Sequence, residues 1–171
     1  MGETCPAEDS PSRLTTRQRR TIDKVMDKAM FLKELMEEHT EIRRLLRDLE
    51  TAVTDSDSMD CRLVSSMLAD LEGKLLDHVA REDRRFYPEL RTGALEAGQT
   101  ALLPALDLFI NSMGKLSARA REFFDNYGSA VRIAADQEGF KKGFMGLKRD
   151  MLERIKSEEG SIYAIYRSYY S

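Results

Sequence analysis

Four long stretches of the chain carry apolar residues every three or four positions, which is the spacing of one face of an α-helix. They run from about Thr21 to Val53, from Val64 to Phe86, from about residue 100 to 126, and from Phe144 to Ile165. No stretch shows the strict alternation typical of a strand. Helices of roughly 25 residues joined by short connections predict an all-α fold, an antiparallel up-down-up-down four-helix bundle.

The apolar faces of these helices define the expected core. They comprise Leu32, Leu35, Met36, His39, Ile42, Leu46, Leu49 and Val53; Val64, Met67, Leu71, Leu75, His78, Glu82 and Phe86; Leu106, Phe109, Ile110, Met113, Leu116, Ala120 and Phe123; and Phe144, Leu147, Met151, Arg154, Glu158, Ile162 and Ile165. Residues 54–60 suit a loop and a helix N-cap. We expect Pro88 to bend or end the second helix, with residues 91–99 as a connection.

The 171 residues suit one domain, and we expect a flexible tail over residues 1–20 followed by the bundle over residues 21–171. A net charge of −3 gives no argument for nucleic acid or anionic lipid, and no apolar run approaches the ~20 residues of a membrane helix. The two cysteines, Cys5 and Cys61, form no disulfide framework, and the first residues lack a secretory signal. These features favour a cytoplasmic protein.

The two halves of the chain resemble each other, which indicates a duplicated helical hairpin. A shift of 74 residues lays the first helix on the third and places His39 on Met113. A shift of 76 lays the second helix on the fourth and places His78 on Arg154. Tyr87 then matches Tyr163, and we expect both tyrosines to pack at an end of the bundle.

Polar residues interrupt three of the four apolar faces at a comparable depth. His39, His78, Glu82, Arg154 and Glu158 would converge in the middle of the bundle. A buried charge without a partner costs several kcal/mol. These groups must therefore satisfy one another, or a metal ion must satisfy them.

At these residues the sequence resembles the hemerythrin-like, HHE cation-binding family. The resemblance rests on His39 in LMEEHTEIRRLL, on HVARE running into DRRFYPEL, and on SEEGSIYAIY near the end of the chain. It covers roughly residues 28–168 and implies a di-iron centre inside the bundle. His39, His78 and Glu82 match ligand positions of that centre. Glu158 or Glu159 matches the second bridging carboxylate, and the spacing of four residues favours Glu158.

The chain departs from the family pattern at two ligand positions. Met113 stands at the third-helix position and Arg154 at the fourth-helix position, so the resemblance implies one metal ion at most. In one hypothesis, His39, His78, Glu82 and Glu158 hold one iron or another divalent ion, with Met113 filling the core. Two imidazoles and two carboxylates suit iron, manganese or zinc.

Two other hypotheses need no metal. Arg154 could clamp Glu82 and Glu158 in a metal-free bundle that serves as a protein-interaction or regulatory module. His39 could instead accept phosphate, which requires an exposed imidazole. Because no nucleophile–base pair or phosphate-binding loop occurs, we expect binding or sensing rather than catalysis. The expected partners are a protein or a second copy of the chain and a small ligand such as dioxygen.

Overall fold

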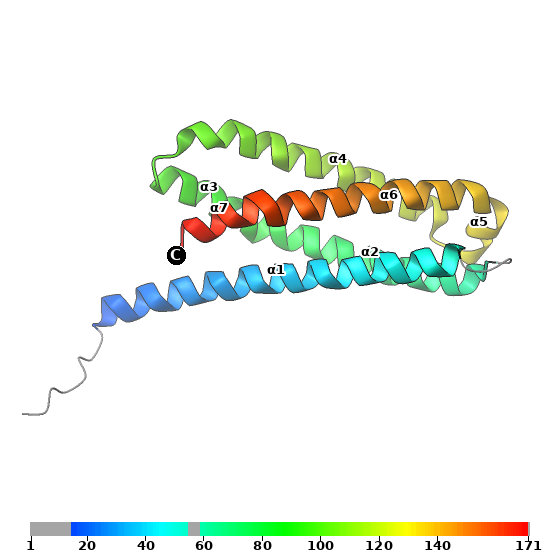
Figure 1. The fold of residues 1–171 in the computed structure, drawn as a ribbon, viewed down its shortest axis with the longest axis horizontal. Helices are drawn as coiled ribbons and strands as arrows, with labels where there is room; N and C mark the ends of the chain where they lie inside the picture. Colours follow the sequence, from blue (N-terminus) through cyan, green and yellow to red (C-terminus); the bar gives the residue numbers. More distant parts are fainter. Residues whose placement is uncertain (1–14, 55–58, 171) are drawn as a thin grey trace, which may run out of the picture.

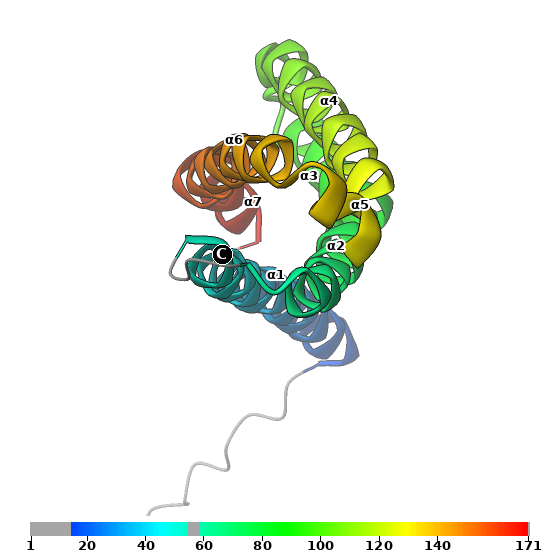
Figure 2. The same cartoon turned by 90° about the vertical axis from the view of Figure 1, so that its right-hand side faces the viewer.

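The computed structural model describes residues 15–54 and 59–170, and these ranges contain helices and no strand. Four rods run alternately up and down the long axis (Figure 1). They are α1 (Thr16–Thr54), α2 (Cys61–Arg81) continued by α3 (Tyr87–Glu96), α4 (Leu103–Tyr127), and α6 (Gln137–Ser157) continued by α7 (Tyr163–Ser168). Viewed end-on, the rods surround a common axis (Figure 2). The predicted all-α bundle is confirmed.

Contacts between neighbouring rods close the bundle into a ring. α1 contacts α2, α2 contacts α4, α4 contacts α6, and α6 contacts α1. A short helix, α5 (Ala130–Ala135), covers one end and buries Ile133 completely. None of the helices described here is long and apolar enough to span a bilayer.

Capping residues fix where several helices begin. The carboxylate of Asp60 accepts hydrogen bonds from the backbone N–H groups of Arg62 and Leu63, so Asp60 is the N-cap predicted within residues 54–60. Residues 55–58 of that expected loop lie outside the described residues. The third rod begins with a 3₁₀ turn (Thr100–Leu102), close to the predicted start near residue 100.

The first helix begins earlier than the apolar pattern indicates. It starts at Thr16 rather than near Thr21, so the expected boundary between residues 20 and 21 lies inside α1. Thr15 caps this start, because its hydroxyl accepts a hydrogen bond from the N–H of Gln18. Residues 1–14 of the expected tail lie outside the described residues.

Pro88 was expected to bend or end the second helix, and the expected end is wrong, as is a connection that begins at residue 91. Helical structure continues through α3 to Glu96. Pro88 lies in the first turn of α3, directly after a π-helical turn (Glu82–Phe86).

The core consists of two apolar clusters on either side of a polar layer. One cluster is centred on Ile42, Leu71 and Phe144, and the other on Leu35, Phe86 and Tyr166. One residue of the predicted core is wrong, because Met36 is 38% exposed. Met67, Phe109, Ile110, Leu116 and Ile165 are half-buried at the edges of the core, and Leu68, which was not predicted, is fully buried. A face that keeps a strict three-and-four spacing drifts relative to a helix of 3.6 residues per turn.

Candidate metal centre

Each half of the bundle contains one π-helical turn. The turns are Glu82–Phe86 and Glu158–Ile162, and both begin at a predicted bridging glutamate. In each turn a backbone N–H bonds five residues back, from Tyr87 to Glu82 and from Tyr163 to Glu158. The first turn precedes Pro88 and the second precedes Ala164, so proline is not what creates them. π-helical turns of this kind occur frequently at functional sites.

The wide turns bring two tyrosines into the interior. A π-helical turn inserts one extra residue, so Phe86 and Tyr87 both face the core, as do Ile162 and Tyr163. The hydroxyls of Tyr87 and Tyr163 lie 3.0 and 2.9 Å from the two carboxylate oxygens of Glu82. The expectation that these tyrosines pack at an end of the bundle is therefore wrong. Burial raises the pKa of both phenols, so each hydroxyl keeps its proton and donates.

Four predicted site residues converge between the apolar clusters. His39, His78, Glu82 and Glu158 are all buried, and each offers one ligand atom within 4.8 Å of the others. The Nε2 atoms of the two histidines lie 3.0 Å apart. His39 Nε2 is 3.2 Å from Glu158, and His78 Nε2 is 3.8 Å from Glu82.

The outer nitrogen of each histidine bonds to a further carboxylate. His39 Nδ1 lies 3.0 Å from Glu159, and His78 Nδ1 lies 2.8 Å from Glu38. A carboxylate only accepts hydrogen bonds, so both Nδ1 atoms carry a proton. When neutral, both imidazoles therefore point an unprotonated Nε2 into the site, which is the arrangement that carboxylates impose on metal-binding histidines.

An arginine holds each of these outer carboxylates in place. Arg43 donates two hydrogen bonds to Glu159, at 2.9 and 2.6 Å. Arg81 donates to Glu38 and also to Glu34. Glu159 was predicted only as an alternative ligand, and Glu38, Arg43 and Arg81 were not predicted from the sequence. Their helical spacing from the histidines is a signal, since Arg43 lies four residues after His39 and Arg81 three after His78.

Arg154 lies where the repeat places the missing fourth-helix histidine. Its guanidinium donates to Glu158 at 2.5 Å and to the Tyr87 hydroxyl at 2.9 Å, and it stacks over the Phe109 ring. The predicted clamp on both bridging carboxylates is thus direct only for Glu158. Arg154 reaches Glu82 through the Tyr87 hydroxyl.

Met113 lies beside Arg154, in the core where the third-helix ligand was expected. Its side chain is buried and lines a cavity of about 20 Å³ together with His78, Arg154 and Glu158. This volume is enough for about one water molecule. Apolar side chains, including those of Ile42 and Met151, form the rest of the wall.

Glu82 and Glu158 have opposite electrostatic environments. Burial, reinforced by the neighbouring Glu158, raises the pKa of Glu82 to about 8. Burial acts in the same direction on Glu158, but its contacts with His39 and Arg154 outweigh it, so its pKa lies below the ordinary value. Burial also lowers the pKa of His78, although Glu38 opposes this. These directions favour a neutral His78 and an ionised Glu158 near neutral pH.

The donor set fits a transition-metal ion. Two nitrogens bound at adjacent corners of an octahedral ion, each about 2.1 Å from it, lie about 3.0 Å apart. The two Nε2 atoms have this separation. The 4.8 Å spread of the four ligand atoms is slightly wider than the about 4.2 Å between opposite ligands of such an ion, so a small contraction would close the set.

A family model described as the hemerythrin HHE cation-binding domain matches residues 30–166. The chain belongs to the hemerythrin HHE family. Searches of curated proteins and of solved structures found no match. The hemerythrin match spans all four rods, so it includes both histidines and both bridging-glutamate positions.

The phosphotransfer hypothesis for His39 is wrong. The imidazole of His39 is fully buried, stacks on the Tyr163 ring and has partners at both nitrogens. No phosphate donor could reach it without opening the bundle.

Proposed function

We propose that this hemerythrin domain binds one divalent metal ion, with iron as the favoured ion, and acts as a binding or sensing module rather than an enzyme. His39, His78, Glu82 and Glu158 are the proposed ligands. The observation that carries the proposal is the pair of inward-facing Nε2 atoms, 3.0 Å apart, whose orientation Glu159 and Glu38 set from outside.

The two Nε2 atoms need a cation between them. Two lone pairs at 3.0 Å repel each other unless a proton or a metal ion lies between. Burial disfavours the protonated form of His78, and one proton would serve only the two nitrogens. A divalent ion would serve both nitrogens and the two carboxylates together.

Arg154 limits the site to one ion. Its guanidinium occupies the second-half ligand position, bonds Glu158 and supplies one fixed positive charge. A second cation beside it would be repelled in a buried region where charges are weakly screened. Arg154 thus stands in for the second metal of the family pattern.

The rest of the site supports a role in sensing a small molecule or a redox state. A bound iron ion would supply a redox-active centre. The cavity of about 20 Å³ beside His78 and Arg154, with room for about one water molecule, is where we propose that a small ligand such as dioxygen approaches the ion. We propose that the bundle passes this state to a protein partner or to a second copy, and that it works in the cytoplasm, where the thiol of Cys61 stays reduced.

Elemental analysis of protein purified from metal-supplemented culture tests the proposal. We expect about one ion per chain, and near-complete loss of that ion in His39→Ala and in His78→Ala. Glu96→Gln, which neutralises an exposed carboxylate at the end of α3, is the matched control and should keep the ion. Protein with no bound metal after loading with iron, manganese and zinc in turn would exclude the proposal.

A metal-free interaction module is the second candidate, and one observation favours it. Among the described residues, Ser117 contributes the single buried side-chain polar atom without a hydrogen-bond partner. The buried network around Arg154 and Glu158 is therefore satisfied by protein groups, as a stable polar core requires. In this case metal content stays near zero, and Arg154→Ala unfolds the protein at markedly lower urea concentration.

A further inference from the structure

The outer face of α1 carries an exposed seam with the spacing of a coiled coil. Residues 15–27 are all exposed, although Ile22, Val25 and Met26 are apolar. Farther along, Met30 is 59% exposed. The seam alternates steps of three and four and consists of Arg19, Ile22, Met26, Ala29, Lys33 and Met36, all exposed. A helical face of this kind gains stability only when another helix covers it.

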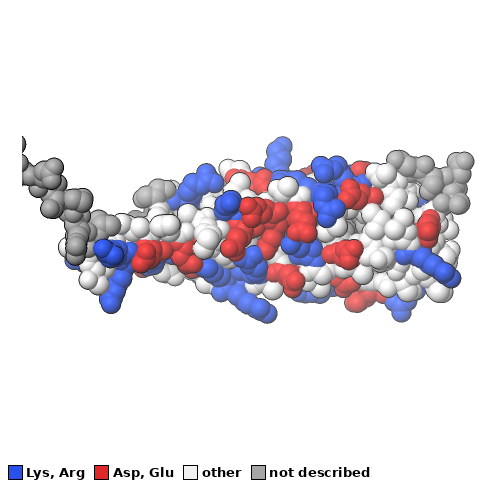
Figure 3. Space-filling model, turned by 90° about the horizontal axis from the view of Figure 1, so that it is seen from below, with Lys and Arg blue, Asp and Glu red and all other residues white. Residues whose placement is uncertain are grey.

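The charges along α1 are segregated. Residues 15–22 contain three arginines and no acid, whereas residues 34–41 contain four glutamates and no lysine or arginine. Figure 3 shows this face of the molecule, with acidic residues gathered over its middle and basic residues near the end where α1 begins. Glu34 and Glu38 bond Arg81, and Glu41 pairs with Lys74, so Glu37 is the exposed glutamate of the acidic segment, paired with Lys33 on the same surface. Two copies of α1 placed antiparallel would set the basic segment of one copy against Glu37 of the other.

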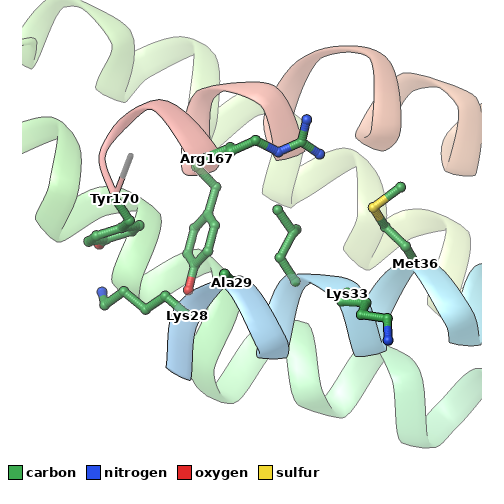
Figure 4. A pocket seen from close by; sticks show the side chains of 8 residues that line it. Lys28, Ala29, Lys33, Met36, Arg167 and Tyr170 are labelled. Atoms are coloured by element: carbon green, nitrogen blue, oxygen red, sulfur yellow. The ribbon is translucent and has the colours of Figure 1, made fainter. Parts of the chain in front are cut away.

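A groove between α1 and α7 adjoins the same seam. It has a volume of about 370 Å³, and Ala29, Leu32 and Met36 on one side face Tyr166 and Tyr170 on the other (Figure 4). Small Ala29 leaves room for an approaching side chain. The lining contains cations and no carboxylate, and its exposed surface is mainly apolar.

We propose that the outer face of α1 is the interface of a two-fold symmetric, antiparallel homodimer whose axis passes between Met26 and Ala29. In this register Met26 packs on the partner's Ala29, and Ile22 packs on the stem of the partner's Lys33. Arg19 covers the partner's Met36 and pairs with the partner's Glu37, and Val25 enters the partner's groove beside Leu32. By symmetry each contact occurs twice, as a closed two-fold interface requires.

Sedimentation equilibrium of the full chain tests the dimer. We expect a concentration-dependent monomer–dimer equilibrium in the wild type. Met26→Glu should weaken dimerisation on the order of 100-fold, because it places two charges in the centre of the interface. Leu108→Glu is the matched control, since Leu108 is an exposed apolar residue on α4, at 72% against 64% for Met26. It should leave the dimerisation constant unchanged.

A charge swap tests the antiparallel register. Arg19→Glu should weaken the dimer about tenfold, since two attractive pairs become repulsive, and adding Glu37→Arg should restore it. Both residues are exposed in the monomer, and an exposed pair such as Lys33–Glu37 contributes at most about 0.5 kcal/mol, so thermal unfolding of diluted samples should change little. A chain that stays monomeric at about 100 µM would overturn the proposal. Binding of a monomeric chain to anionic vesicles through the same face would also overturn it. A dimer insensitive to Met26→Glu, or one that the swap does not restore, would overturn the interface.

Discussion

The two hairpins of this hemerythrin bundle share a backbone feature and differ in the side chains at the candidate ligand positions. Both contain a π-helical turn that begins at a buried glutamate and ends before a buried tyrosine. The first hairpin adds His39 and His78, whereas the second places Met113 and Arg154 at the equivalent positions. The features that aim a carboxylate inward therefore persist where the imidazoles do not. The π-helical turn and the side chains at the ligand positions can change independently, because the turn depends on local hydrogen bonds and metal binding depends on donor chemistry.

Arg154→His should erase most of the difference between the hairpins. It replaces the resident cation with an imidazole at the position equivalent to His78, so metal content should rise above one ion per chain toward two. Elemental analysis after iron loading measures this. Arg149→His, an exposed position on the same helix, should leave metal content unchanged. Equal uptake in the wild type and in Arg154→His would count against the alignment of the two halves.

Isosteric changes at the two glutamates should have opposite effects on the metal-free protein. Glu158→Gln leaves the buried guanidinium of Arg154 without its carboxylate and should lower the free energy of unfolding by about 3 kcal/mol. Glu82→Gln resembles the protonated acid that the site favours, so it should change stability little or increase it. Urea unfolding at pH 7 in the presence of a chelator compares them. Equal losses would show that the halves do not differ electrostatically.

The pH dependence of stability should separate the same two residues. Because the pKa of Glu82 is raised to about 8 in the folded state, its contribution is complete below about pH 4.5 and is lost as pH rises through 8. The pKa of Glu158 is lowered, so its contribution is present above about pH 4.5 and is lost on acidification. Urea unfolding of the metal-free protein between pH 5 and 9 should show a decline of a few kcal/mol that Glu82→Gln removes. An unchanged slope in Glu82→Gln would refute this assignment.

Glu38→Gln and Glu159→Gln should each weaken metal binding by about 10- to 100-fold, a smaller effect than loss of a ligand. Each carboxylate orients one histidine through its Nδ1–H, Glu38 from the first hairpin and Glu159 from the second. Competition with a chromogenic chelator measures the affinity. Glu34→Gln is the matched control, because Glu34 touches Arg81 but neither histidine. An affinity that falls equally in all three variants would argue against orientation by these carboxylates.

Much of the bundle was predictable because the spacing of apolar residues in an amphipathic helix identifies its buried face. The positions of Leu35, Ile42 and Leu71 in the core follow from that spacing. The prediction failed at Tyr87. A π-helical turn adds a residue that a regular helical repeat does not include, so Tyr87 faces the core next to the predicted core residue Phe86.

The sequence by itself determined the fold class, the family resemblance, and the identities of His39, His78 and Glu82 as candidate ligands, because these depend on periodicity and residue chemistry. The tertiary structure decided which glutamate lies innermost, since Glu158 is buried beside His39 while Glu159 reaches its outer nitrogen. It also decided that Tyr87 and Arg154 meet in the same network. Such contacts join positions far apart in the chain, and their distances depend on how the helices pack and where the backbone widens, which no local pattern encodes.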